Sequence, residues 1–142
     1  MYLHGINIIH RDIKPQNIMY TGSEFKIADF GVSKSIDFSS AKTKAGTPLY
    51  MAPEVMTEGN SSYTSKADIW SVGITMYYMT TGEFPWNSIH GSHLKLMREI
   101  ANGEPKKLSV YRYNEHFVKM VNACSRKEPA SRISAEKLYQ IA

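Results

Sequence analysis

The chain has 142 residues, the size of one domain, and its hydrophobic fraction of 42% and charged fraction of 21% are ordinary for a globular protein. The net charge of +4 is mild, and no basic stripe alternates with aromatic residues, so a nucleic-acid partner is not expected. A single cysteine, Cys124, excludes an internal disulfide and a zinc site of several cysteines. The longest apolar runs are too short for a membrane segment, and we expect an intracellular protein, cytoplasmic or nuclear.

The first predicted element is the end of a helix. Residues 1–5 (MYLHG) resemble a last helical turn closed by glycine, so we expect the sequence to begin inside an element of a longer domain. Apolar runs at 6–9 and 18–20 predict short strands on either side of a polar loop. A turn at 21–23 then leads to a third predicted strand over 25–27.

The second half of the chain is predicted to be helical, after a polar loop without periodicity over 32–45. A long helix over 66–80, capped by Thr64 or Ser65 and ended by Gly82, carries few charges and should be buried nearly all round. Three further helices are predicted, over 92–101, over 115–125 and from 134 onward. The first of these should bury one apolar face, made of Leu94, Met97 and Ile100.

The candidate chemistry lies in three short motifs, HRDIKPQN at 10–17, DFG at 29–31 and APE at 52–54. Asp12 follows an apolar run, and a carboxylate in such a loop can orient a hydroxyl and take its proton as a general base. Asn17 and Asp29 offer the hard oxygen ligands that Mg²⁺ requires, and Lys14 can neutralise charge on a phosphate. Each motif alone is a weak signal, but together with the approach GTPLYMAPE at 46–54 they form too long a pattern for coincidence.

This pattern resembles the C-terminal lobe of a eukaryotic serine/threonine protein kinase, over essentially all of residues 1–142. The resemblance implies a mainly helical fold with a small β cluster at its N-terminal end. It also implies a partial kinase domain that runs from the end of helix E through the catalytic loop and activation segment to the C-lobe helices. The implied reaction is transfer of the γ-phosphate of Mg-ATP to serine or threonine of a protein substrate.

The resemblance also implies what the sequence lacks. No Gly-rich loop and no Val-Ala-x-Lys strand occurs, so the amino-terminal lobe of the same kinase is an expected partner. The 142-residue chain alone should therefore bind ATP poorly and be inactive or very weak.

Several catalytic and cofactor roles follow from the resemblance. Asp12 is the implied base, Lys14 the contact to the γ-phosphate, and Thr47 the threonine that bonds both and shapes the acceptor pocket. Asn17 and Asp29 are the implied magnesium ligands. The implied floor of the adenine pocket is Met19, supported from the long helix by Thr75 and Met79.

Other matched positions imply structural roles. Asp68 would hold the backbone of the catalytic loop, and Arg132 would form an ion pair with Glu54. His10 is expected to be a core histidine bonded to backbone, and Phe30 is expected to pack inward and fix Asp29.

A regulatory role is implied for the activation segment. Arg11 and Lys34 are placed to clasp a phosphate, and Thr43 stands where that phosphate would be attached. We therefore expect phosphorylation at Thr43, which phosphopeptide mapping of the active kinase would test.

Alternatives remain open. The chain could be a non-catalytic docking module derived from a kinase lobe, acting through the face near residues 86–100. It could also be an incomplete gene model or a pseudogene with no role of its own. A decayed pseudokinase is disfavoured because Asp12 and Asp29 are both present. A small-molecule phosphotransferase is disfavoured because such enzymes typically lack the segment around residues 52–54.

Overall fold

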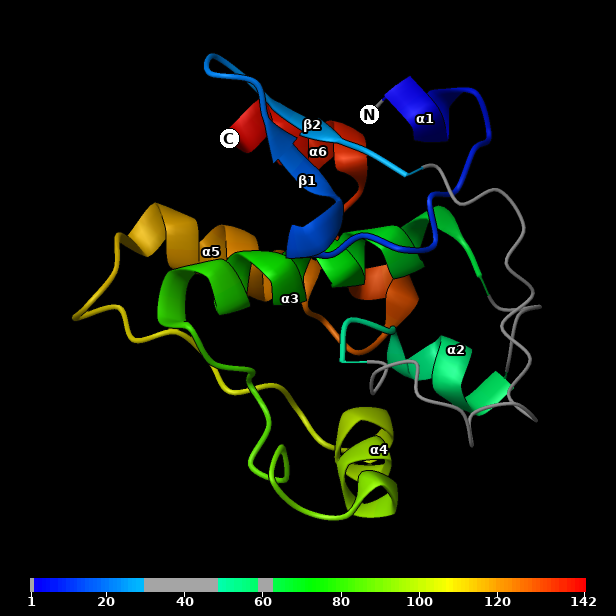
Figure 1. Ribbon diagram of the computed structural model, residues 1–142, viewed down its shortest axis with the longest axis vertical. Coiled ribbons are helices and arrows are strands. Elements are labelled where there is room, and N and C mark those ends of the chain that lie inside the picture. The colour runs from blue at the N-terminus through cyan, green and yellow to red at the C-terminus, as the bar shows by residue number, and fades with distance from the viewer. Residues whose placement is uncertain (1, 30–48, 59–62) are drawn as a thin grey trace.

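The computed structural model describes residues 2–29, 49–58 and 63–142. Figure 1 shows α3 running through the middle of the fold, with the β1–β2 hairpin on one side and α4 on the other. The described residues are mainly helical with one two-stranded sheet, so the predicted fold class is confirmed. In chain order the elements are α1 (Tyr2–Gly5), the 3₁₀ turn η1 (Pro15–Asn17), β1 (Ile18–Tyr20), β2 (Phe25–Ile27), α2 (Pro53–Glu58), α3 (Ser65–Thr81), α4 (His93–Asn102), α5 (Glu115–Cys124), the 3₁₀ turn η4 (Pro129–Ser131) and α6 (Ala135–Ile141).

The central helix α3 has the ends that its sequence predicts. The Thr64 side chain accepts a hydrogen bond from the Lys66 amide, and Gly82 closes the helix in a left-handed conformation, with φ of 73°. The full turn at residues 67–70 of α3 is buried, whereas Met79 in the last turn is 57% exposed. The predicted burial nearly all round therefore holds for that turn and not for the whole helix. No helix in the described residues combines the length and the apolar content that would let it span a membrane.

Helix α3 crosses α5 at a very close approach. A Cβ atom at Gly73 would lie 2.8 Å from the Cβ of Cys124 and 3.2 Å from the amide nitrogen of Ser125. Only glycine fits at this crossing without moving the backbone of α5. Cys124 is fully buried, and burial raises the pKa of its thiol to about 12, so it is a protonated core residue.

The larger hydrophobic core lies between α2, α3 and α4. Trp70 and Trp86 stack at its centre, with ring centroids 6.2 Å apart and an angle of 18° between the rings. The buried members of this core are Ala52, Val55, Ala67, Trp70, Ile74, Trp86, Leu96 and Ile100. A smaller core joins α3 and α5, and its buried members are Leu108, Val118 and Val121.

The buried face of α4 differs from the predicted one. Leu96 and Ile100 are 3% and 0% exposed, whereas Leu94 is 60% exposed. Residues four apart lie on the same side of a helix, so Leu96 and Ile100 point together into the core. Leu94 lies two positions from Leu96, which turns it away from the core, so its predicted burial is wrong.

The strand predicted over residues 6–9 is also wrong. Residues 6 and 7 continue from α1 as a turn, in which Asn7 has a φ of 58°. The amide of His10, just beyond, donates to the buried Asp68 carboxylate instead of to a strand. The other two predicted strands exist as β1 and β2, antiparallel, with Ile18 opposite Ile27.

Helix α4 is tied to the segment before it by one carboxylate. Glu99 accepts hydrogen bonds from the amides of Asn87 at 2.8 Å and Ser88 at 2.7 Å. Burial raises the pKa of Glu99, but these hydrogen bonds outweigh it and hold the pKa below the usual 4.5.

This pairing predicts acid sensitivity. Because the pKa of Glu99 is lower in the folded than in the unfolded chain, its contribution to stability is present above the unfolded pKa and is lost as the pH falls through the folded value. The difference in unfolding free energy between the parent and Glu99→Gln should therefore shrink between pH 6 and pH 3, as urea titrations would show. The exposed Glu104→Gln is the control, and a difference independent of pH would contradict the assignment.

Candidate active site

The loop that carries Asp12 is anchored to the first turn of α3 by Asp68. The Asp68 carboxylate, 1% exposed, accepts the amides of His10 and Arg11, each at 2.9 Å. The ring of His4 lies 2.8 Å from the same carboxylate. A buried carboxylate thus satisfies two successive backbone amides and fixes where the loop begins, because leaving such groups unpaired would cost about 1–3 kcal/mol each.

A second contact on this loop comes from Tyr63, which sequence reasoning missed. Its hydroxyl donates to the carbonyl of Arg11 at 3.3 Å, and the Arg11 guanidinium carbon lies 5.6 Å from the centroid of its ring. A tyrosine before a helix gives no sequence signal for such a role, because the contact joins residues 52 positions apart.

Asp12, Lys14 and Asn17 form one hydrogen-bonded group. The Lys14 ammonium donates to both Asp12 carboxylate oxygens, at 2.9 and 2.8 Å. The Asn17 amide nitrogen donates to the Asp12 carbonyl at 2.7 Å and to its carboxylate at 2.9 Å. The side chains of Asp12 and Lys14 are 44% and 33% exposed, so both can be reached from solvent. The predicted base and the predicted phosphate contact are thus adjacent.

The end of the strand pair, just before Asp29, is hydrogen-bonded to this group. The amide of Ala28 donates to the Asn17 carbonyl at 2.8 Å, and the ring of His10 lies 3.2 Å from the Ala28 carbonyl. Ala28 is therefore held from both sides by the loop that contains Asp12. Asp29 comes next, exposed and with a φ of 57°, a conformation uncommon outside glycine. His10 itself is 2% exposed.

The donor set around Asp12 fits magnesium shared with a phosphate. Asn17 uses its amide nitrogen toward Asp12, which leaves its carbonyl oxygen for a cation, and Asp29 adds an exposed carboxylate. Within the described residues, no three or more His, Cys, Asp or Glu side chains gather into a metal site. One amide oxygen from Asn17 and one carboxylate from Asp29 suit Mg²⁺, which usually takes one or two carboxylates and completes its shell with water and substrate phosphates.

Of the other predicted site residues, the structure describes the three of the adenine pocket and leaves four others outside its described residues. Thr75 is 3% exposed inside α3, whereas Met19 on β1 and Met79 on α3 are 58% and 57% exposed. The adenine-pocket role of these three residues stays a prediction. Four predicted residues lie outside the described part of the chain, namely Phe30, Lys34, Thr43 and Thr47.

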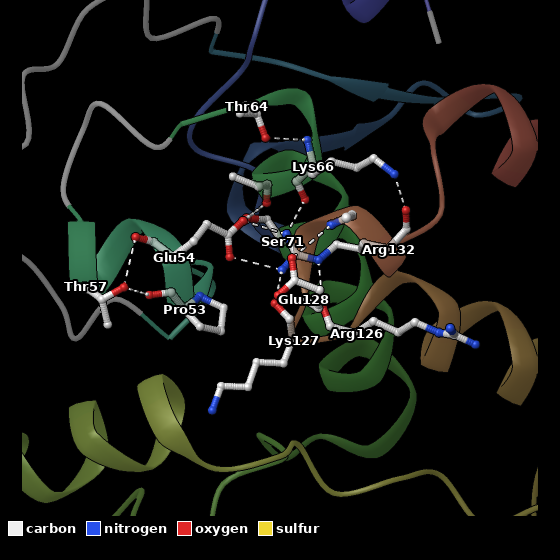
Figure 2. Close-up of polar contacts among 12 residues, drawn as sticks. Pro53, Glu54, Thr57, Thr64, Lys66, Ser71, Arg126, Lys127, Glu128 and Arg132 are labelled. Atoms are coloured by element: carbon white, nitrogen blue, oxygen red, sulfur yellow. Dashed lines mark hydrogen bonds and ion pairs between the residues drawn. The ribbon is translucent and has the colours of Figure 1, made fainter.

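The structure brings Glu54 and Arg132 together, 78 positions apart in the chain (Figure 2). The Arg132 guanidinium, fully buried, donates to the two Glu54 carboxylate oxygens at 2.7 and 3.0 Å. It also lies over the Trp70 ring, 5.1 Å from the centroid. Its other donors reach the carbonyls of Arg126, Lys66 and Lys127, at 2.8, 2.7 and 2.9 Å. All five guanidinium N–H groups are thereby used.

Lys66 returns a hydrogen bond from its ammonium group to the Arg132 carbonyl. Burial, and after it repulsion by the charges of Arg132 and Lys137, lowers the pKa of Lys66. The arginine thus joins α2, the start of α3 and η4 in one polar cluster (Figure 2).

Comparisons with known proteins agree with this arrangement. The model of the protein kinase domain family matches residues 1–142. The chain is 42% identical to the serine/threonine-protein kinase dst2 of Dictyostelium discoideum, covering 98% of this chain and 12% of that protein. It is 40% identical to the serine/threonine-protein kinase ppk11 of Schizosaccharomyces pombe, covering 97% and 44%. It is 36% identical to the dual specificity mitogen-activated protein kinase kinase mek-1 of Caenorhabditis elegans, covering 94% and 38%.

The chain spans less than half the length of each of these curated relatives. Within that span, Asp68 holds the start of the loop, Asp12 contacts Lys14 and Asn17, and the strand pair ends just before Asp29. The chain belongs to the protein kinase domain family.

Proposed function

We propose that this chain supplies the catalytic half of a serine/threonine protein kinase, which transfers the γ-phosphate of Mg-ATP to a protein hydroxyl. The observation that carries the proposal is the contact of Asp12 with both Lys14 and Asn17, beside the strand end that bears Asp29. Phosphoryl transfer depends chiefly on positioning and on charge stabilisation, and this group offers a base, a cation and metal ligands in one place.

Each side chain has a distinct task in this proposal. The exposed edge of the Asp12 carboxylate would accept the hydrogen of the substrate hydroxyl, orient its oxygen and take its proton. Lys14, already within reach of that carboxylate, would counter the charge of the moving phosphate. Asn17 and Asp29 would hold Mg²⁺, which when bound neutralises the charge of the nucleotide phosphates.

The acceptor class is inferred from the relatives. Two of those described above are named serine/threonine-protein kinases, and the third is named a dual specificity kinase. We infer a protein serine or threonine as the acceptor for this chain. A docking module acting through the face near residues 86–100 stays the alternative, because Leu94 in that segment is 60% exposed although Trp86 and Ile100 are buried in the core.

The test is phosphotransfer to a serine/threonine peptide mixture by the native protein that carries this sequence, with Mg-ATP. Asp12→Asn should lower the rate about 10²–10⁴-fold, because it removes the proton acceptor but keeps the shape of the side chain. The exposed Glu136→Gln on α6 makes the same chemical change outside the three motifs and should leave the rate unaltered. Full activity in Asp12→Asn would refute the proposal.

The 142-residue chain alone should bind Mg-ATP weakly. Its described residues supply groups for the metal and the phosphates, but of the three predicted adenine-pocket residues Met19 and Met79 are exposed to solvent and Thr75 is buried inside α3. Isothermal titration is expected to give a Kd of about 1 mM or weaker, which is about −4 kcal/mol. Micromolar binding would show that the chain builds the nucleotide pocket by itself.

A further inference from the structure

Tyr63 contacts the catalytic loop at the residue just before Asp12. It lies in the segment that leads into α3, and its hydroxyl donates to the carbonyl of Arg11 at 3.3 Å. Its ring also packs against the core cluster that contains Trp70. Tyr63 therefore connects a rigid part of the fold to the loop that carries the proposed base.

The backbone at Arg11 needs such support. Its φ is 69°, in the left-handed region, where a residue other than glycine is strained and persists only when its surroundings hold it. Asp68 holds the amide of Arg11 on one side, and Tyr63 holds its carbonyl on the other. That carbonyl belongs to the same peptide group as the amide of Asp12. A rotation of this peptide would therefore swing Asp12 away from Lys14 and Asn17.

We propose that Tyr63 is a positioning residue for phosphotransfer, whose hydroxyl and ring hold the Arg11–Asp12 peptide in the orientation that presents Asp12 to Lys14 and Asn17. The proposal rests on the proposed function for its effect on catalysis. The effect on the backbone does not depend on that function and can be measured separately.

Tyr63 contacts Arg11 in two ways, while the Asp12 amide of the same peptide group donates to the Nδ1 atom of His10 at 3.3 Å. Burial raises the pKa of Tyr63 to about 12, and the charges of Asp68 and Asp12 add to the effect, so the hydroxyl remains a proton donor at neutral pH. At 3.3 Å the hydrogen bond is longer than the usual 2.7–2.8 Å, so it is weak by itself. The Arg11 guanidinium over the ring supplies the second contact, because a cation is attracted to the face of an aromatic ring. Removing the hydroxyl alone should thus have a smaller effect than removing the ring.

The first experiment measures amide hydrogen exchange in the folded chain for Tyr63→Phe and Tyr63→Leu. We expect the amides of residues 11 and 12 to exchange about threefold faster in the Phe variant and about tenfold faster in the Leu variant. The amide of Ile74, in the middle of α3, should keep its parent rate in the Phe variant. The matched control is Tyr20→Phe, because the Tyr20 hydroxyl also donates to a backbone carbonyl, that of Gly22 at 2.7 Å, in the hairpin turn.

A purely structural Tyr63 would give a different result. Exchange would then rise equally at residues 11, 12 and 74, in proportion to the loss of global stability, and the positioning role would be overturned. Unchanged exchange at residues 11 and 12 in both variants would overturn it as well.

The second experiment follows phosphotransfer by the native protein with the same variants. We expect kcat to fall about threefold for Tyr63→Phe and about tenfold for Tyr63→Leu, with the KM for Mg-ATP unchanged and with no loss in Tyr20→Phe. An unchanged kcat in both Tyr63 variants, in a protein whose activity needs Asp12, would overturn the catalytic part of the proposal. If Asp12→Asn stays active, the proposed function fails, and the exchange measurement still decides whether Tyr63 holds the peptide.

Discussion

Replacing Arg132 by methionine is expected to lower the free energy of unfolding by about 3–5 kcal/mol, because it leaves a buried charge without its partner. The Glu54 side chain is only 11% exposed, and both of its carboxylate oxygens accept hydrogen bonds from Arg132. The substitution also leaves the carbonyls of Arg126, Lys66 and Lys127 without their donor.

Urea denaturation followed by circular dichroism would measure this loss. The exposed neighbour Arg126→Met is the matched control and should change stability by no more than about 0.5 kcal/mol. The double variant Glu54→Leu with Arg132→Met should recover part of the loss, because it removes both charges together. A loss below about 1 kcal/mol in Arg132→Met would mean that the chain reorganises to let water reach Glu54.

Trp70→Ala is expected to cost a similar amount, about 3–5 kcal/mol, through loss of buried area and the cavity left behind. Trp70 is 0% exposed and stands between the Trp86 ring on one side and the Arg132 guanidinium on another. Tyr111→Ala removes an aromatic side chain that is 97% exposed, and it should leave the unfolding midpoint in urea almost unchanged.

The Trp70 and Arg132 predictions are coupled, and a double-mutant cycle would show it. Residues in direct contact do not act independently, so the loss in Trp70→Ala with Arg132→Met should fall short of the sum of the single losses. The smaller change Trp70→Phe keeps a ring under the guanidinium and should cost less than Trp70→Ala. Strict additivity would indicate that the guanidinium and the indole do not interact.

Local signals in the sequence were sufficient for α3, α4, α5 and α6, whereas α2 was not predicted. Thr64, Ser92 and Ser134 accept hydrogen bonds from the first turns of α3, α4 and α6, as helix-capping side chains should. These contacts join residues two or three positions apart, so the sequence alone contains both partners. The same holds for the turn between β1 and β2, in which Gly22 adopts a positive φ of 91°.

What the sequence could not supply depends on contacts between distant segments. The run at residues 6–9 is apolar enough for a strand, but the nearby amide of His10 is taken by Asp68 on α3. The spacing of apolar residues in α4 allowed Leu94 to be buried, and only the position of the core under Leu96 decides against it. Tyr63 could not be assigned to the catalytic loop, because no residue near it in the sequence indicates a contact with Arg11.

The candidate site was predictable to the extent that the motifs carry it. The three motifs identified Asp12, Lys14, Asn17 and Asp29 as a group, and the structure places the first three in direct contact. The distance between the motifs along the chain contains no information about how Ala28 is held on both faces by the loop. That detail came only from the three-dimensional arrangement.

The ion pair between Glu54 and Arg132 has a consequence for the order of folding. It closes a loop of 78 residues, whereas helices such as α3 and α5 form from neighbours along the chain. We expect a contact that closes so long a loop to form late in folding, after the transition state. Its stabilisation would then mainly slow the unfolding of the native state. This single arginine would then govern how long the native state persists far more than how quickly the chain reaches it.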